Sequence, residues 1–510
     1  MRCLKESSVE YRNRTRQGLF KSVVRLASSL DLYGPLARIS RRFVTEISPD
    51  GSEKRAAAGN VSNDITVVFL DRARFRGDVE ILAMQPGIRC LSLSPTFQRF
   101  LLGSFVREPT QDEWTSHTET PGIRYEFRSA PAGSVIGRNR AKYREFLQRF
   151  VPVLFEQFGV DLVVNSDERY RRHADLTWIA DKMGFPHVCL HREALFTVPA
   201  TYRDAVDRHR WFGRFNGSKI LVQNEITRQV LLEAGYATPD QLQIVGCLRM
   251  DGHLQRFLNE DRKARSPNVR PRVLMFAWGP GRRLSDGTYF DLTAAGQATI
   301  RALTRFAKRH PEAEVIVKIK DIHAKGAGGG LLSVLKRALL DEVDTLDAVP
   351  NISFSTERMA AADLIEWSTV VCAMQSTAVL EAAVAGRPVI LPHFRSLREQ
   401  VRAEEVLMFQ EQRHLFDVPE DEQDLERLVE LRCKVPVVPP ETEKELSGLF
   451  DRLVSPLAAD ATHNCLSAFR ELARGGREKR EAIGNGRRLE SPLARPMVSG
   501  TEQQIQRPPQ

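Results

Sequence analysis

Short apolar runs alternate with longer amphipathic stretches along most of the chain. The runs are bounded by polar residues and rich in Val, Ile and Leu, which is typical of buried parallel strands. We expect strands near residues 65–70, 88–93, 161–166, 186–191, 218–224, 242–246, 273–277, 314–320, 351–355, 369–373 and 388–391. The longer stretches predict helices near 139–158, 171–183, 225–234 and 290–308. This alternation predicts parallel sheets with helices on both faces.

The length of the chain, 510 residues, predicts two domains. The expected fold class is α/β, with two Rossmann-like, doubly wound domains that face a cleft. The expected parts are a basic amphipathic N-terminal segment with a linker (1–60), a first domain (61–251), a linker (252–270), a second domain (271–474) and a disordered tail (475–510).

The segment from Tyr11 to Phe43 mixes apolar residues with Arg and Lys and is broken at Gly34 and Pro35. Its apolar residues recur at intervals of roughly three and four, which predicts one or two basic amphipathic helices. Such helices can lie on a membrane interface or dock on the protein, and we favour docking. The polar residues 48–63 predict a linker.

Charge is concentrated at the two ends of the chain. Residues 1–60 hold 12 Lys and Arg against 6 Asp and Glu, and residues 466–510 hold 9 against 5, so the middle is close to neutral although the net charge is +9. A nucleic-acid-binding core would carry the basic excess on the folded domain itself, so we expect no nucleic acid as a partner. Basic ends are typical of solvated tails, or of a peripheral contact with an anionic membrane.

Location and redox chemistry follow from two further patterns. No apolar run is long enough to span a membrane, and the N-terminus lacks the apolar core of a secretory signal. We therefore expect a cytoplasmic protein, with the inner face of the cell membrane as the alternative. The seven cysteines are scattered without a C-x-x-C pair, which predicts neither a disulfide framework nor a zinc site. Cys189 and Cys372 fall within predicted strands and should be buried.

The stretch from Asp363 to Pro392 combines a strand, a polar turn, a helix rich in Ala and another strand. The turn, Gln375 to Thr377, lies at the carboxyl end of a strand, where open α/β sheets bind ligands. Ser376 is a good N-cap for the helix, which should end at Gly386.

This turn carries candidate chemistry for a nucleotide. A helix N-terminus offers free N–H groups and a positive dipole end, and the hydroxyls of Ser376 and Thr377 lie beside it, so a phosphate would fit there. Glu381, about one turn later, has a carboxylate that can accept hydrogen bonds from ribose hydroxyls. The alternative is that Ser376 is only an N-cap and Glu381 only a solvated helix residue.

The pattern S-T-x-x-x-E-A-x-x-x-G-x-P-V-I resembles the nucleotide-binding segment of the GT-B glycosyltransferases and their relatives. Within that group it is most similar to bacterial surface-carbohydrate and capsule-type proteins, polyol-phosphate transferases and nucleotide-sugar 2-epimerases. The resemblance implies that Ser376 and Thr377 cradle the donor phosphates and that Glu381 holds the ribose. A second segment, I-V-G-C-L-R-M-D from Ile244 to Asp251, resembles the one where the two domains of these proteins join. A helix near 457–474 would then cross back to the first domain.

Two other segments of the second domain are candidates for the donor phosphates. Gly279 and Gly281 permit close backbone approach, and Arg282 and Arg283 follow them with positive charge, although a plain turn is an equal alternative. The GT-B relatives carry a strand ending in K-x-H-P. This chain has Lys318, Lys320 and His323 there but no His-Pro pair, so the residue that fills the role stays open.

The candidate base of a transfer reaction lies in the first domain. His191, Arg192 and Glu193 follow a predicted strand and match the H-[KR]-E segment of the capsule-type proteins. His191 or Glu193 could accept the proton of an acceptor hydroxyl, or the two could only brace the loop. Asp167 and Glu168 are a weaker alternative.

The resemblance implies a glycosyltransferase that moves a sugar from a nucleotide-activated donor to a polysaccharide, lipid-linked or other surface-glycan acceptor. The nucleotide sugar is a substrate and no cofactor is expected. No D-x-D motif is evident, so we expect metal-independent chemistry. The alternatives are a nucleotide-sugar 2-epimerase, a polyol-phosphate transferase, or a catalytically silent scaffold at a membrane. Replacing Glu381 by Ala is expected to weaken donor binding with little loss of stability.

Overall fold

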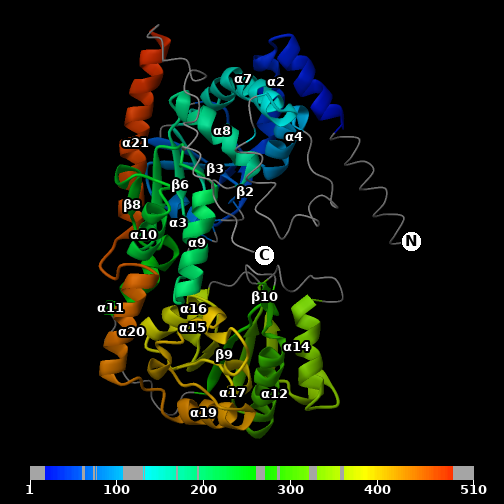
Figure 1. Ribbon diagram of the computed structural model, residues 1–510, viewed down its shortest axis with the longest axis vertical. Helices are drawn as coiled ribbons and strands as arrows, with labels where there is room; N and C mark the ends of the chain where they lie inside the picture. The colour runs from blue at the N-terminus through cyan, green and yellow to red at the C-terminus, as the bar shows by residue number, and fades with distance from the viewer. Residues whose placement is uncertain are drawn as a thin grey trace, which may run out of the picture.

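The computed structural model describes residues 18–485 apart from 60–63, 73–74, 76, 107–129, 131–132, 168–169, 192–194, 260–269, 284–287, 321–329 and 356–360. Two α/β domains lie one after the other along the longest axis of the molecule (Figure 1). Each is built around its own sheet.

An eight-stranded sheet forms the centre of the first domain, in the order β2-β1-β4-β3-β5-β6-β7-β8. Neighbours from β4 to β8 are parallel, whereas β1 pairs antiparallel with β2 and β4. The strands are β1 (Val44–Ile47), β2 (Glu53–Arg55), β3 (Ile65–Leu70), β4 (Ile88–Leu93), β5 (Leu162–Asn165), β6 (His187–Leu190), β7 (Lys219–Val222) and β8 (Leu242–Ile244).

Helices cover both faces of this sheet. Val68 and Leu70 of β3 pack into a core with α4 and α7, whereas Val67 and Phe69 pack on the opposite face, where α21 from the end of the chain contributes Phe469. The helices of the first domain are α2 (Tyr33–Ser40), α3 (Asp78–Ala83), α4 (Pro95–Phe105), α7 (Val135–Glu156), α8 (Arg171–Lys182), α9 (Pro199–Trp211) and α10 (Glu225–Glu233).

The second domain has a parallel sheet in the order β13-β12-β9-β14-β15. This is the order 3-2-1-4-5 of a doubly wound Rossmann sheet. The strands are β9 (Arg272–Phe276), β12 (Glu314–Lys318), β13 (Ile352–Ser355), β14 (Val370–Ala373) and β15 (Val389–Ile390), with a separate hairpin of β10 (Gly281–Arg283) and β11 (Tyr289–Asp291).

The sheet of the second domain is also covered on both faces. Met275 and Cys372 pack with α12 and α19, and Leu274 and Val371 pack with α16 and α20 on the other side. The helices are α11 (Asp251–Asn259), α12 (Thr293–Arg309), α14 (Gly330–Leu340), α15 (Ala361–Trp367), α16 (Ala378–Val384), α17 (Arg395–Arg398), α18 (Ala403–Val406), α19 (Glu422–Lys434) and α20 (Pro440–Leu453). The predicted fold class, α/β with two Rossmann-like, doubly wound domains, is confirmed.

The last helix, α21 (Ala461–Gly484), returns to the first domain and runs along it (Figure 1). Cys465 and Phe469 are buried against strands of the first sheet, and Arg477 Nε donates to Asp161 Oδ1 (2.7 Å). The predicted disordered tail was therefore placed too early, because residues 475–484 are helical. The buried apolar face of this last stretch includes Gly476, which lies against Pro186 and leaves no room for a side chain.

The other predicted connections also contain regular structure. Residues 53–55 of the expected linker 48–63 form β2, and residues 252–259 of the expected linker 252–270 belong to α11. The N-terminal segment has a helix over residues 18–29 and docks on the first domain through buried Phe20 and Val24. Among the described residues, no helix is both long and apolar enough to cross a membrane.

Candidate functional site

The order of the second sheet reverses between β9 and β14. In doubly wound sheets, ligands bind outside the carboxyl ends of the two strands at such a point. The ends of these strands are level, since Phe276 pairs with Ala373. Two predicted donor segments follow them directly, namely Gly279 to Gly281 after β9 and Gln375 to Thr377 after β14. The topology therefore brings together two stretches that are separated by about a hundred residues in the sequence.

The turn after β14 has an unusual backbone. Gln375 has a φ of 56°, a left-handed conformation that non-glycine residues seldom adopt. The backbone N–H groups of Gln375, Ser376 and Thr377 donate to no atom of the described residues. Left-handed and right-handed residues in succession point neighbouring N–H groups toward one place, which makes a concave site for an anion. Strain of this kind is retained mainly at functional sites.

The capping of α16 differs from the prediction. The N-cap residue is Thr377, and its side chain does not cap the helix. Ser376 Oγ instead accepts a hydrogen bond from Ala378 N (3.3 Å), so Ser376 precedes the cap by one residue. The hydroxyl of Thr377 donates to the Glu381 carboxylate (2.8 Å). The helix starts one residue later than expected, at Ala378, although Thr377, with φ −60° and ψ −25°, already has helical angles.

Glu381 is buried, with an exposed fraction of 2%. Its Oε1 accepts hydrogen bonds from Thr377 Oγ1 (2.8 Å) and from Arg249 Nη2 (3.3 Å). Its Oε2 accepts none from the part of the chain that the structure describes. The interpretation of Glu381 as a solvated helix residue is therefore wrong. One carboxylate oxygen is held by the protein, and the other keeps its capacity to accept from a hydroxyl.

Arg249 was not assigned a role from the sequence, although it lies in the segment Ile244 to Asp251. The structure joins this segment to the turn after β14 through the Arg249–Glu381 ion pair. The only sequence signal was that one matched segment carries a positively charged residue, Arg249, and the other a negatively charged one, Glu381. Because 132 positions separate the two residues, the pairing is visible only in three dimensions.

The same segment forms the connection between the domains. Cys247 N donates to Ser455 Oγ (2.9 Å), and Asp251 accepts from the backbone N–H groups of Ala461 and Thr462 (3.1 and 2.6 Å). Gly246 has a φ of 95°, and a Cβ there would lie 3.0 Å from Ala461. The segment from Ile244 to Asp251 thus fixes both the start of α21 and the side chain of Glu381.

Two further donor candidates, Gly281 and Lys318, lie near the switch point. Gly281 begins β10, and a Cβ on it would lie 2.4 Å from Phe290 O, so hairpin packing explains this glycine. Lys318 ends β12, next to β9, and its carbonyl accepts from Ala277 N. The side chain of Arg282 and all of His323 lie outside the described residues.

The sheet of the first domain has its own switch point, between β3 and β5. Asp71 follows β3, and Asn165 to Asp167 end or follow β5; all four of these residues are buried. His173, near the start of α8, is also buried, and burial together with the neighbouring Arg172 lowers its pKa from 6.5 to about 3. Sequence reasoning named Asp167 and missed Asp71 and His173.

His191 lies at the carboxyl end of β6, beside β5. Its backbone N–H donates to Leu221 O (2.8 Å), and its ring centre is 6.4 Å from that of the buried His209. Strand β5, which pairs with β6, ends in Asn165, so His191 and Asp167 lie at the same edge of the sheet. Glu193, Arg192 and Glu168 lie outside the described residues.

Helix α18 connects the loops of the two domains. Gln375 Nε2 donates to Val406 O in α18 (3.0 Å). Thr197, in the loop that follows His191, accepts a hydrogen bond from Phe409 N (3.3 Å), three residues after α18. Figure 1 shows α9 and α16 where the two domains meet. The loops after β6 and β14 are thus held against the same short helix.

No protein-family model and no curated protein sequence matches the chain. Among solved structures, it is similar to a UDP-GlcNAc 2-epimerase from Neisseria meningitidis bound to UDP-GlcNAc, with 11% identity, 80% of this chain and 99% of that chain covered, and a TM-score of 0.40. A glycosyltransferase from Rickettsia africae matches with 11% identity, 81% and 99% coverage and a TM-score of 0.37. An Anabaena protein in complex with UDP and glucose matches with 13% identity, 82% and 100% coverage and a TM-score of 0.35.

Proposed function

We propose that this chain is an enzyme acting on a nucleotide sugar, and specifically a glycosyltransferase with a surface-glycan acceptor. The observation that carries the proposal is the turn Gln375 to Thr377, whose three backbone N–H groups have no acceptor among the described residues and lie at the switch point of the second sheet. A diphosphate would accept from these groups, and Glu381 Oε2 would accept from a ribose hydroxyl.

The chemistry requires a leaving group and a base. When the bond between the sugar carbon and the donor phosphate breaks, negative charge develops on the diphosphate, and preorganised N–H donors stabilise that charge most in the transition state. The acceptor hydroxyl loses its proton to a base from the first domain, for which His191 and Glu193 are the candidates. The products are a glycoside, a nucleoside diphosphate and a protonated base.

The donor site is tested by thermal unfolding with UDP, GDP, ADP, TDP, CDP and CMP. One nucleotide should raise the unfolding midpoint, because a ligand at 100 times its dissociation constant stabilises by roughly 2.7 kcal/mol. Two variants at one position then isolate the N–H group. Thr377→Val removes only the hydroxyl, whereas Thr377→Pro also removes the N–H at a φ of −60° that suits proline.

We expect Thr377→Pro to weaken nucleotide binding at least tenfold more than Thr377→Val does. Equal affinities of the two variants would refute the N–H assignment. Failure of every nucleotide to shift the midpoint would refute the donor site itself, and the unliganded midpoints of the variants report whether they fold.

A 2-epimerase is the second candidate function. Epimerisation at a carbon of the sugar needs groups that remove and return a proton, with no acceptor. Asp71 and Asp167 are buried at the edge of the first sheet, which is where such groups would stand if that sheet faces the sugar. Incubation with the donor alone separates the two functions. A changed nucleotide sugar indicates an epimerase, and product that appears only with an acceptor indicates a transferase.

We further propose that the N-terminal helix contacts an anionic membrane, where lipid-linked acceptors reside. Leu19, Leu26 and Leu30 are 68%, 57% and 57% exposed and recur at intervals of seven and four, so they form one stripe. Lys21 and Arg38 lie in the same segment. Figure 1 shows the N-terminal helix at the end of the first domain that is farthest from the second domain. Exposed leucines with neighbouring basic residues are typical of interfacial helices.

Vesicle sedimentation tests this contact. The full-length protein should bind vesicles that contain an anionic lipid, and binding should fall with added salt. Replacing Leu19, Leu26 and Leu30 together by Ser should reduce binding at least tenfold. The matched control replaces three exposed leucines of the second domain by Ser, namely Leu340, Leu346 and Leu431. This control variant should bind the vesicles as the parent protein does. Equal loss in both triple variants would exclude the N-terminal stripe as the contact.

A further inference from the structure

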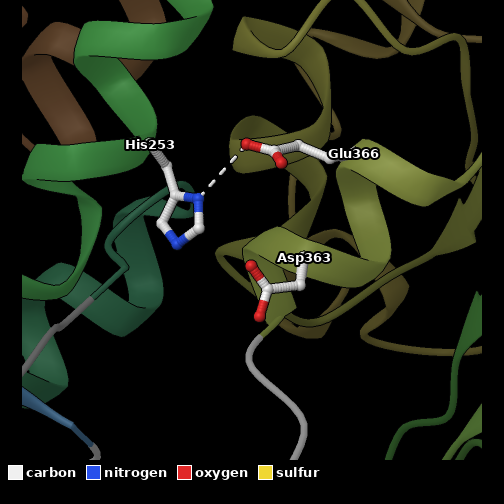
Figure 2. A group of neighbouring side chains, drawn as sticks. All are labelled: His253, Asp363 and Glu366. Atoms are coloured by element: carbon white, nitrogen blue, oxygen red, sulfur yellow. Dashed lines mark hydrogen bonds and ion pairs between the residues drawn. The ribbon is translucent and has the colours of Figure 1, made fainter.

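Three potential metal ligands from two helices meet on the second domain. His253 belongs to α11, and Asp363 and Glu366 belong to α15. One ligand atom from each lies within 4.8 Å of the others, and His253 Nδ1 is 3.3 Å from Glu366 Oε1. Figure 2 shows the imidazole directed toward both carboxylates. The sequence separates His253 from Glu366 by 113 positions, so no spacing motif announces this group.

Packing holds the backbone of both helices in place. Leu254 and Phe257 of α11 are buried in the same core cluster as Leu364 and Ile365 of α15. Arg387 donates to the carbonyl oxygens of Ile365 and Glu366 (both 3.1 Å), which fixes the end of α15. The three side chains therefore start from fixed positions, and only side-chain rotation is needed to bring them closer.

The donor set selects the kind of ion. An imidazole nitrogen with two carboxylate oxygens suits Zn²⁺ and related transition metals, whereas Mg²⁺ and Ca²⁺ prefer oxygen ligands alone. Two ligands about 2.1 Å from a tetrahedral zinc ion lie roughly 3.4 Å apart. The His253–Glu366 separation of 3.3 Å already has this value. Asp363 is exposed, so its carboxylate can rotate toward the same point.

We propose that His253, Asp363 and Glu366 bind a divalent transition metal of the zinc type, with water completing the coordination. This site is separate from the proposed donor site and does not depend on it. Helix α11 follows the segment that joins the domains, and α15 leads into β14, whose end carries the donor turn. A bound ion would fasten these two helices to each other.

A second histidine provides a matched control. His310 also has two carboxylate neighbours, with Nδ1 3.1 Å from Glu312 Oε1 and Nε2 3.2 Å from Glu430 Oε1. Because the carboxylates lie on opposite sides of the ring, His310 cannot chelate one ion together with both. Loss of a ligand should affect metal binding only at His253.

The test is calorimetric titration of chelator-treated, full-length protein with ZnCl₂, MnCl₂ and MgCl₂. We expect Zn²⁺ to bind with one-to-one stoichiometry and to raise the unfolding midpoint, and Mg²⁺ to bind at least tenfold more weakly. His253→Gln and Asp363→Asn should each weaken Zn²⁺ binding at least tenfold, and His310→Gln should leave it unchanged. Absence of one-to-one binding, or equal affinity of the parent and His253→Gln, would overturn the proposal. These outcomes are independent of nucleotide binding.

Discussion

Replacing Glu381 by Gln should lower nucleotide affinity at least tenfold and also destabilise the fold by about 2 kcal/mol. Glutamine keeps the shape of the side chain but removes the charge that Arg249 faces at 3.3 Å. Removing one partner of a fully buried ion pair costs more, but the Arg249 side chain is 18% exposed, and solvent screens part of the loss. This result would correct the expectation from sequence that replacing Glu381 leaves stability nearly unchanged.

A double-mutant cycle separates the two effects of Glu381. Arg249→Met should destabilise the protein, and adding Glu381→Gln to it should cost less than Glu381→Gln alone, because the two side chains share one interaction. Glu422→Gln is the matched control. Glu422 is likewise paired with arginine, here with Arg301 and Arg305 (2.5 and 3.0 Å), but it lies on α19. The Glu422→Gln variant should lose stability with no change in nucleotide affinity. A similar loss of nucleotide affinity in this control would show that Glu381 does not contact the nucleotide.

The second large effect is expected in acid. His173 and His393 are fully buried. Burial is the main cause that lowers both pKa values from 6.5 to about 3, helped by Arg172 for His173 and by Arg413 and Arg398 for His393. Between these values the unfolded chain takes up protons that the folded chain cannot, so stability falls as the pH drops below 6.5. At pH 4.5 each histidine should cost about 3 kcal/mol of stability.

His393→Leu tests this prediction at a site where the ring makes no described hydrogen bond. Neither ring nitrogen of His393 has a partner among the described residues, so Leu should cost little at pH 7.5. The stability of the variant relative to the parent should improve by about 3 kcal/mol from pH 7.5 to pH 4.5. His463→Leu, at an exposed position, is the control. Urea unfolding at both pH values measures the difference, and parallel behaviour of parent and His393→Leu would contradict the prediction.

The sequence alone determined the elements and the fold class. Runs such as Ile65 to Leu70 are apolar on both sides of the strand, which only a sheet covered on both faces can bury. Polar residues after a strand, as at Gln375 to Thr377, mark the edge where the chain leaves the core. These signals are local, because the period and polarity of a few consecutive residues decide them. Boundaries were less well predicted. Residues 475–484 are polar but form helix, because Gly476 packs against Pro186 and neighbouring Arg and Lys side chains bond to the first domain.

Only the tertiary structure decided which charged groups meet. Arg249 with Glu381, and His253 with Glu366, come from elements more than a hundred residues apart. Their distances depend on strand order and on how α11, α15 and α16 pack. The left-handed Gln375 and the three N–H groups of its turn are equally invisible in the sequence, because a glutamine there carries no signal of positive φ. Local patterns fix what each segment becomes, whereas a site needs groups from several segments, and long-range packing alone brings these together.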